Sequence, residues 1–253
     1  MKNLQGNMMG VVARTLFWLV VLIGFIIIFI WLLLKLPGVS KPAIASTPLL
    51  NPSPAVTSTV GPQLLHRDFE QPGGNLGYID SGDWSRNVVD GNGLLEIHSS
   101  PSGGYGNLPS ITYGSEAWSN YVFSFRFKVS VCDPKGFLGC MVIIAFRNEP
   151  GQAYVLMINT NSGEVILNFG GRDGWVAINK GITDTYLDLP LGTWHSVLLT
   201  ANREVISASV DGKQTTLVSD DRLKTGAVAI TVGAGATAQI DDINAWSISS
   251  VAP

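Results

Sequence analysis

Apolar and polar side chains alternate along much of the chain beyond residue 63. In the segment 121–130 the odd positions hold Tyr, Phe or Val, and most even positions hold Ser, Arg or Lys. A period of two residues is typical of a strand with one buried face. The same alternation, or a short apolar run, predicts further strands at 94–98, 140–147, 154–159, 165–169, 175–179, 194–201, 206–210, 227–232 and 238–246.

Turn-forming residue pairs separate these expected strands. Asp90-Gly91 and Asp211-Gly212 have the composition of two-residue hairpin turns. The sequence after residue 36 shows no stretch with a helical period. We therefore predict an all-β fold, a two-sheet antiparallel jelly-roll sandwich.

The segment 15–34 is the longest uncharged apolar run in the chain. At a rise of about 1.5 Å per residue, a helix over this run covers roughly the 30 Å hydrocarbon core of a bilayer. Trp18 and Trp31 near its two ends match the interfacial positions that aromatic residues favour. We predict one transmembrane helix at 15–36, in contact with the lipid bilayer.

Two other interpretations of this run stay open. One is a signal peptide cleaved after Ala43-Ile44-Ala45, although that site lies far beyond the apolar run. The other is a helix buried in a protein core. Lys2 and Arg14 precede the run and Lys35 and Lys41 follow it, so the positive charges favour a cytoplasmic N-terminus only slightly. We expect a single-pass protein of the cell membrane with an extracytoplasmic C-terminal domain.

Proline, serine and threonine dominate the segment that follows the apolar run. Residues 37–62 hold six prolines and a single charged residue, Lys41. Such a composition buries too little apolar area to offset the entropy cost of ordering, so we expect an extended linker. The expected divisions are a cytoplasmic N-terminus at 1–14, the helix at 15–36, the linker at 37–62, the jelly roll at 63–248 and a C-terminal tail at 249–253.

The charge of the chain bears on its partners. Its net charge is −3 at pH 7, and its basic residues form no cluster. Nucleic-acid binding depends on concentrated positive charge that neutralises phosphates. We therefore expect no nucleic-acid partner.

Cys132 and Cys140 bracket a short loop between two expected strands. Cysteines on adjoining strands can satisfy the geometry of a disulfide. We predict that they form one, which agrees with an exported domain because disulfides persist in oxidising compartments. Two reduced thiols without a special role are the alternative. The histidines His66, His98 and His195 are scattered and lack the spacing of metal ligands.

Several segments, taken together, resemble a known superfamily. Asp68-Phe69-Glu70 opens the expected domain, 121–128 follows, and the segments 192–197, 208–213 and 240–243 come near its end. In this order they resemble the concanavalin A-like lectin/glucanase superfamily, in particular its laminin-G-like and carbohydrate-binding jelly rolls. The resemblance covers about residues 65–246. It implies the fold, whereas activity varies widely among proteins that share that fold.

The resemblance does not extend to the catalytic residues of the laminarinase-like glucanases. Those enzymes carry acidic residues in a Glu-x-Asp-x-x-Glu arrangement, because glycoside hydrolysis needs two carboxyl groups beside the scissile bond. In this chain Glu164 and Glu204 each stand alone. We therefore expect a non-catalytic protein and assign no catalytic residue.

The candidate ligand-binding residues lie near the ends of expected strands. Arg147 and Tyr154 flank one connection, and Asn168, Arg172 and Trp175 surround a glycine-rich loop. Arginine and asparagine can hydrogen-bond sugar hydroxyls, and exposed aromatic rings stack on the apolar faces of sugars. The alternatives are an Arg that forms an ion pair or caps carbonyls at a sheet edge and a Trp that belongs to the core.

Acidic residues lie in the first and last segments of the expected domain. Terminal strands pair in many jelly rolls, and related carbohydrate-binding modules hold a structural calcium ion at such a place. The resemblance therefore implies a calcium ion held by Glu70 and Asp242. In the alternative, these carboxylates cap turns or pair with Arg and Lys.

The functional prediction is a membrane-anchored, surface-displayed jelly roll that binds a glycan without catalysing a reaction. One alternative is a structural or accessory subunit that binds a membrane or envelope protein, and an exposed apolar patch would favour it. A weaker alternative is a glycoside hydrolase or lyase, which a deep pocket with two carboxylates would favour.

Overall fold

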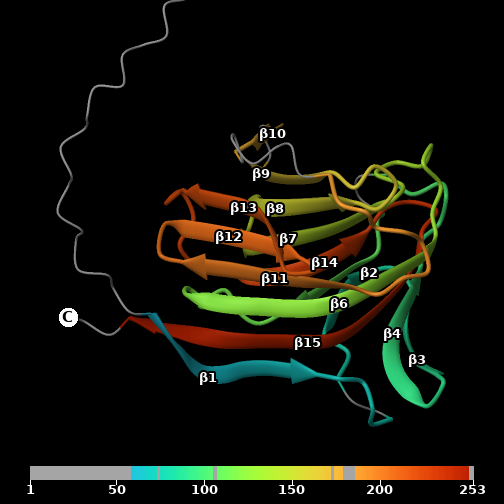
Figure 1. Ribbon diagram of the computed structural model, residues 1–253, viewed down its shortest axis with the longest axis horizontal. Helices are drawn as coiled ribbons and strands as arrows, with labels where there is room; N and C mark the ends of the chain where they lie inside the picture. The colour runs from blue at the N-terminus through green and yellow to red at the C-terminus, as the bar shows by residue number, and fades with distance from the viewer. Residues whose placement is uncertain (1–57, 73–74, 105–106, 172–173, 179–185, 251–253) are drawn as a thin grey trace, which may run out of the picture. The chain divides into compact units, whose positions relative to one another are not determined.

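Two antiparallel sheets make up the described part of the protein. The computed structural model describes residues 58–72, 75–104, 107–171, 174–178 and 186–250, which contain 15 strands, β1 to β15. Within those ranges no helix is long and apolar enough to cross a membrane. The transmembrane helix expected at 15–36 falls outside the described residues. The predicted two-sheet sandwich is confirmed, and Figure 1 shows its two layers.

The first sheet has eight strands in the order β13-β12-β11-β6-β15-β4-β3, and β1 also pairs with β15. On one side β15 pairs with β6, and on its other side its start pairs with β4 and its remainder with β1. The strands are β1 (Ser58–Arg67), β3 (Trp84–Val89), β4 (Asn92–His98), β6 (Tyr121–Val131), β11 (His195–Asn202), β12 (Val205–Val210), β13 (Lys213–Ser219) and β15 (Thr237–Ser250).

The second sheet has seven strands in the order β10-β9-β8-β7-β14-β5-β2. Its central strands β7 and β8 are joined by a short connection, and they carry the residues that matter most below. The strands are β2 (Tyr78–Ser81), β5 (Ser110–Tyr113), β7 (Met141–Glu149), β8 (Gln152–Asn159), β9 (Val165–Gly171), β10 (Gly174–Ala177) and β14 (Ala227–Val232).

The core lies between the sheets and is rich in aromatic side chains. Along β6 the side chains of Tyr121, Phe123, Phe125 and Phe127 are at most 2% exposed, and their polar neighbours face outward. Fully burying such a side chain contributes about 1.5–3 kcal/mol. The alternation that predicted this strand is therefore also what binds the eight-stranded sheet to its partner.

The strand boundaries differ from the expected domain limits at both ends. β1 begins at Ser58, inside the segment expected to be linker, and β15 runs on to Ser250. Residues of β1 form a strand because their backbone pairs with β15, despite the Pro and Gly in this segment. The register of the pairing shifts between Val60 and Gln63, on either side of Pro62. Such an irregularity accommodates a proline that cannot donate a ladder hydrogen bond.

The two predicted hairpin turns are confirmed. Asp90 and Gly91 have φ values of 53° and 84°, and Asp211 and Gly212 have 50° and 73°. Positive φ at both central residues is what the favoured two-residue hairpin turn requires. These turns connect β3 to β4 and β12 to β13.

Candidate functional site

A groove of about 440 Å³ lies on the outer face of the seven-stranded sheet. Its lining combines apolar, aromatic and uncharged polar side chains. None of the described lining residues carries an ionisable group. They are Ser81, Leu108, Ser110, Phe137, Leu138, Ile143, Ala145, Val155, Met157, Asn168, Trp175 and Thr231.

The floor of the groove consists of two rows of side chains that run across the strands. In one row Ile143 of β7 pairs with Met157 of β8. In the next row Ala145 of β7 pairs with Val155 of β8, which pairs in turn with Asn168 of β9. Because side chains alternate between the faces of a sheet, the residues between these positions point into the core. The floor is therefore apolar, with one amide at its β9 end.

Trp175 of β10 forms one wall. Its ring lies against Gly170 of β9, because a Cβ atom placed on Gly170 would sit 2.4 Å from Trp175 Cε3. Any side chain at Gly170 would displace the indole. Trp175 is nevertheless 43% exposed, so much of its ring is accessible to a ligand.

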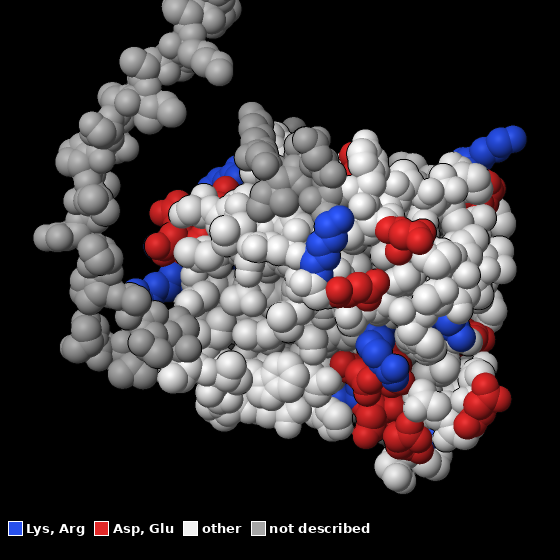
Figure 2. Space-filling model, in the orientation of Figure 1, with Lys and Arg blue, Asp and Glu red and all other residues white. Residues whose placement is uncertain are grey.

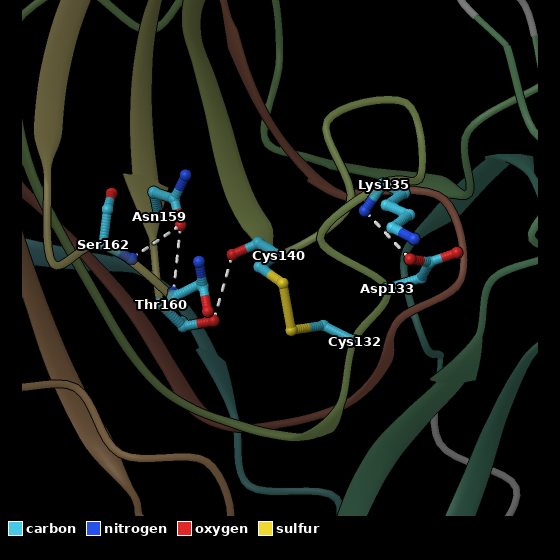
Figure 3. The surroundings of a disulfide bond; sticks show 8 residues. Cys132, Asp133, Lys135, Cys140, Asn159, Thr160 and Ser162 are labelled. Atoms are coloured by element: carbon cyan, nitrogen blue, oxygen red, sulfur yellow. Dashed lines mark hydrogen bonds between the residues drawn. A yellow bond between two sulfur atoms is a disulfide. The ribbon is translucent and has the colours of Figure 1, made fainter.

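A loop closed by a disulfide forms another part of the lining, through Phe137 and Leu138. The predicted bond between Cys132 and Cys140 is present, and Figure 3 shows its surroundings. Phe137 O accepts a hydrogen bond from the backbone N of Ala234 at 3.0 Å. The covalent link and the backbone bond together fix this wall against the sheet.

Uncharged polar groups interrupt the apolar lining at two places. Asn168 Nδ2 donates to Met157 Sδ at 3.1 Å. Thr231 Oγ1 donates to Ser110 Oγ at 3.1 Å, and Ser110 Oγ donates to Asp80 Oδ2 at 3.5 Å. The groove can therefore form hydrogen bonds as well as apolar contacts with a ligand.

The structure brings together two of the five predicted ligand-binding residues. Asn168 and Trp175 both line the groove. Arg172 lies outside the described residues. A role in ligand binding for these three residues stays a prediction.

Tyr154 lies inside the sandwich, which corrects the expectation that it faces a ligand. It is 0% exposed, because it stands one position from the outward-facing Val155 on a strand of period two. Its hydroxyl donates to Asp220 Oδ1 at 2.5 Å and accepts from the backbone N of Leu223 at 3.2 Å. Burial, with this bond to Asp220, raises the pKa of Tyr154 to about 12.

Arg147 is also 0% exposed, so it too is corrected from a ligand-binding to an interior position. The register shift between Phe146 and Glu149, with a φ of 44° at Arg147, places it in a bulge of β7. Its Nη1 donates to Leu223 O at 2.8 Å and its Nη2 to Ser119 O at 3.3 Å. Arg147 therefore links β7 to two loops through their carbonyl groups. This is close to the alternative of an Arg that caps carbonyls at a sheet edge.

A second cavity, of about 590 Å³, lies beside the β11–β12 turn and carries carboxylates. Asp220 accepts hydrogen bonds from Tyr154 and Arg222. Burial opposes ionisation of Asp220, but these bonds outweigh it and hold its pKa below the usual value. A glycosidase needs one carboxyl with a raised pKa as its general acid, so Asp220 is unsuited to that role. The lining residues are Ser119, Asn120, Arg147, Arg203, Glu204, Ser219, Asp220, Asp221 and Lys224.

The two residues predicted to hold calcium have separate protein contacts. Glu70 Oε1 accepts a hydrogen bond from the backbone N of Gly93 at 3.3 Å, and Asp242 Oδ2 lies 2.6 Å from Arg126 Nε. Among the residues that the structure describes, no group of three or more His, Cys, Asp and Glu side chains is placed to hold a metal ion. The ion pair of Asp242 matches the alternative of an acid paired with Arg, and calcium stays a prediction.

The opposite face of the sandwich has a different character. In Figure 2, acidic and basic side chains gather over β15, and much of the remaining surface is uncharged. Arg126 pairs with Asp241 as well as Asp242, at 2.9 Å and 2.6 Å. Arg126 and Lys128 lie 5.1 Å and 5.2 Å from the ring centre of Trp194. The charges at this place are thus engaged with one another.

The sequence analysis missed the apolar floor of the groove, namely Ile143, Ala145, Val155 and Met157. A signal for it was present. Residues 141–146 and 153–158 are apolar at every position, without the alternation seen in 121–130. A strand that is apolar on both faces indicates that both faces are covered.

Comparisons with known proteins give matches of fold only. No family model matches the chain, and no curated protein sequence matches it. A carbohydrate-binding module, CBM66 from Bacillus subtilis, matches with a TM-score of 0.52 and 12% identity, covering 67% of this chain and 94% of the module. The sandwich resembles the concanavalin A-like and galectin-like jelly rolls.

Two further solved structures agree with this assignment of the fold. A protein of unknown function with a galectin-like fold, also from Bacillus subtilis, has a TM-score of 0.54 and 10% identity, covering 77% of this chain and 100% of its own. The cellulose induced protein Cip1 has a TM-score of 0.52 and 12% identity, covering 74% and 97%. At such low identity the agreement concerns the fold and carries no residue roles.

Proposed function

We propose that this protein is a membrane-anchored, surface-displayed module that binds a glycan without catalysing a reaction. The observation that carries the proposal is the exposed ring of Trp175 beside an apolar floor that ends in the Asn168 amide. Sugars present apolar C–H faces as well as hydroxyl groups. A site of this composition can stack on the first and hydrogen-bond the second.

Two further observations support a non-catalytic glycan-binding role. The described lining of the groove contains no carboxylate, whereas glycoside hydrolysis needs two beside the scissile bond. One protein of similar fold, CBM66, is named as a carbohydrate-binding module. The proposal places the ligand on the outer face of the seven-stranded sheet.

The anchoring part of the proposal rests on the sequence and the disulfide. The uncharged run 15–34 has the length of a membrane-spanning helix, and the proline-rich segment 37–57, ahead of β1, would serve as a spacer between this helix and the jelly roll. The bond between Cys132 and Cys140 favours an oxidising compartment, outside the cytoplasm. Protease added to intact cells should degrade the domain, and only detergent should release the protein from membranes.

A glycan array probed with the full-length protein in lipid nanodiscs tests the binding role. Trp175→Ala should weaken any binding at least about tenfold, because an aromatic anchor at an interface contributes about 2 kcal/mol or more. Trp194→Ala, just before β11 of the opposite sheet, is the matched control and should leave binding unchanged. Folded protein that ignores every glycan would contradict the function, and binding that survives Trp175→Ala would contradict the site.

A second candidate is a structural or accessory subunit that binds a membrane or envelope protein. The observation that favours it is the accessible apolar part of the groove, formed by the partly exposed Ala145 and Met157 and the exposed Phe137 and Trp175, since apolar surface patches often mark protein interfaces. Cross-linking through a photoreactive residue at position 175 distinguishes the two. Under this candidate one membrane protein is captured in intact cells and glycans fail to compete for it.

A further inference from the structure

The hydroxyl groups of the groove already donate their hydrogens to the protein. Ser81 Oγ donates to Leu108 O, and Thr231 Oγ1 donates to Ser110 Oγ at 3.1 Å. Ser110 Oγ donates in turn to Asp80 Oδ2 at 3.5 Å. What remains for a ligand at these positions is oxygen lone pairs, which accept hydrogen bonds.

Asn168 adds an acceptor at a particular place on the floor. It directs an amide hydrogen to Met157 Sδ at 3.1 Å, and its carbonyl oxygen Oδ1 is an acceptor. Across the sheet Asn168 pairs with Val155, which pairs with Ala145. An amide oxygen therefore stands at the end of a row of small apolar side chains.

The charge and the polarity of the lining limit the chemical type of ligand that fits the groove. Its described residues are uncharged, so a ligand gains nothing from carrying charge. The hydroxyl hydrogens point to the protein, so the hydroxyl oxygens and Asn168 Oδ1 offer acceptors to a ligand, while the indole N–H of Trp175 and the second amide hydrogen of Asn168 are donors. The floor has to be covered by apolar atoms, because a hydroxyl pressed against it would lose its hydration without compensation.

From this pattern we infer that the groove selects neutral glycans that carry acetamido groups, an inference that rests on the proposed glycan-binding function. The acetamido N–H is a donor for Asn168 Oδ1, and its methyl group packs on Ala145, the partly exposed member of the row, next to the buried Val155. The sugar ring itself stacks on Trp175. One substituent thus satisfies the two adjacent features of the floor, the amide oxygen and the apolar row.

Other ligand classes meet only part of this lining. A glycan carboxylate or sulfate carries a negative charge, and no described lining residue supplies a positive charge to compensate it. A simple hexose offers hydroxyl donors but no methyl group for the floor. An alkyl chain covers the floor but leaves the acceptors of Asn168, Ser81 and Thr231 without donors.

The test compares matched sugars on full-length protein in lipid nanodiscs by calorimetric titration. Each pair consists of a neutral oligosaccharide and its partner with acetamido in place of the C2 hydroxyl, in the gluco, galacto and manno series. An acidic oligosaccharide of similar length and octanol complete the set. In at least one pair the acetamido member should bind about tenfold or more tightly, since one buried methyl and one net hydrogen bond together give that factor.

The outcomes separate this inference from the function on which it rests. Equal or tighter binding of the hydroxyl members, or tighter binding of the acidic sugar, would overturn the acetamido preference and leave glycan binding in place. Absence of binding across all sugars would overturn both. Binding of octanol alone would assign the groove to an apolar partner and would likewise overturn both.

A single substitution sharpens the result. Val155→Thr replaces a floor methyl by a hydroxyl at almost the same shape, and Val155 lies outside the main core between the sheets. It should reduce the ratio of acetamido to hydroxyl affinity several-fold without abolishing binding. Val122→Thr, at an outward position of β6, is the matched control and should leave the ratio unchanged. An unchanged ratio in Val155→Thr, with a melting temperature close to that of the wild type, would contradict the placement of the acetamido group.

Discussion

The outer faces of the two sheets differ although their inner faces share one core. On β6 the outward positions include Ser124, Arg126 and Lys128, whereas on β8 they include Ala153, Val155 and Met157. The inward alternation is sufficient to build the sandwich. The apolar residues at the outward positions have a different role: they contact the disulfide loop and line the groove that this loop helps to form.

The loop explains how apolar residues lie buried on an outer face. Ile143 and Val155 are 8% and 6% exposed and belong to a cluster separate from the main core, together with Leu108 and Ala234. Where the cover is incomplete, the groove exposes the rest of the floor. The outer face of the eight-stranded sheet has no comparable apolar cluster among the described residues.

The largest expected effect comes from placing the same charge on both faces. Val155→Asp buries an unpaired carboxylate against Ala145 and Asn168, so it should lower the free energy of unfolding by about 3 kcal/mol or more. Thr200→Asp on the outward face of β11 should cost less than about 1 kcal/mol, because water continues to solvate the charge. Urea denaturation of both variants measures the difference. Equal losses would show that the two faces are energetically alike.

Removing the disulfide should have the next largest effect. The bond spans a sequence separation of 8. Closing a loop of about this size stabilises the folded state by about 2–3 kcal/mol in the chain-entropy model. The double variant Cys132→Ser/Cys140→Ser should lose this amount in denaturation and also weaken ligand binding, since Phe137 and Leu138 belong to the closed loop. Reducing agent should reproduce the loss in the wild type and have no effect on the variant.

A smaller and more local effect is expected at the Trp175 wall. Gly170→Ala places a methyl group 2.4 Å from Trp175 Cε3 and 2.6 Å from Gly174 O, so the indole has to move. Ligand affinity should fall in the same direction as in Trp175→Ala, while the main core is untouched. Gly104→Ala is the control, because its Cβ would meet nothing within 4 Å. Fluorescence of Trp175 should change in the first variant only, and unaltered binding there would argue against the indole as a wall.

The fold was predictable because its strongest energetic contributions leave a mark on the sequence. In 121–130 every second residue is a large apolar side chain, and those residues form the core as expected. β1 was missed because Pro62 and the Ser and Thr around it indicate a linker, and only the pairing with β15 turns them into a strand. Tertiary pairing of this kind has no local signature.

The site was predictable only in part, for a related reason. Asn168 precedes a glycine-rich loop and Trp175 follows it, and this position predicted both as ligand-binding residues. In the fully apolar run 153–158 the sequence does not tell which residues face inward, so Tyr154 could not be assigned to a face. Arg147 turns inward through a bulge, and a bulge is set by the register of two strands rather than by one residue.

The two faces should also differ in their response to pH, with the smallest expected effects. Asp211, in the turn beside β11, accepts hydrogen bonds from His195 Nδ1 and from the backbone N of Ser196, each at 2.7 Å. Burial opposes its ionisation, but these bonds prevail and hold its pKa below the usual 3.8. A carboxyl with a lowered folded pKa stabilises the protein above its unfolded pKa, and that contribution is lost as the pH falls through the folded pKa. Asp211→Asn should therefore show a smaller loss of melting temperature below about pH 4 than the wild type does.

Ligand binding in the groove should be insensitive to pH over the range where the protein stays folded. No described lining residue ionises, so the affinity for a neutral ligand should change less than about twofold between pH 5 and pH 8. Titrations at both values, on wild type and on Asp211→Asn, measure this. A tenfold change shared by both proteins would mean that a charged group reaches the ligand. That result would contradict the uncharged character of the groove, which is its clearest difference from the charged face over β15.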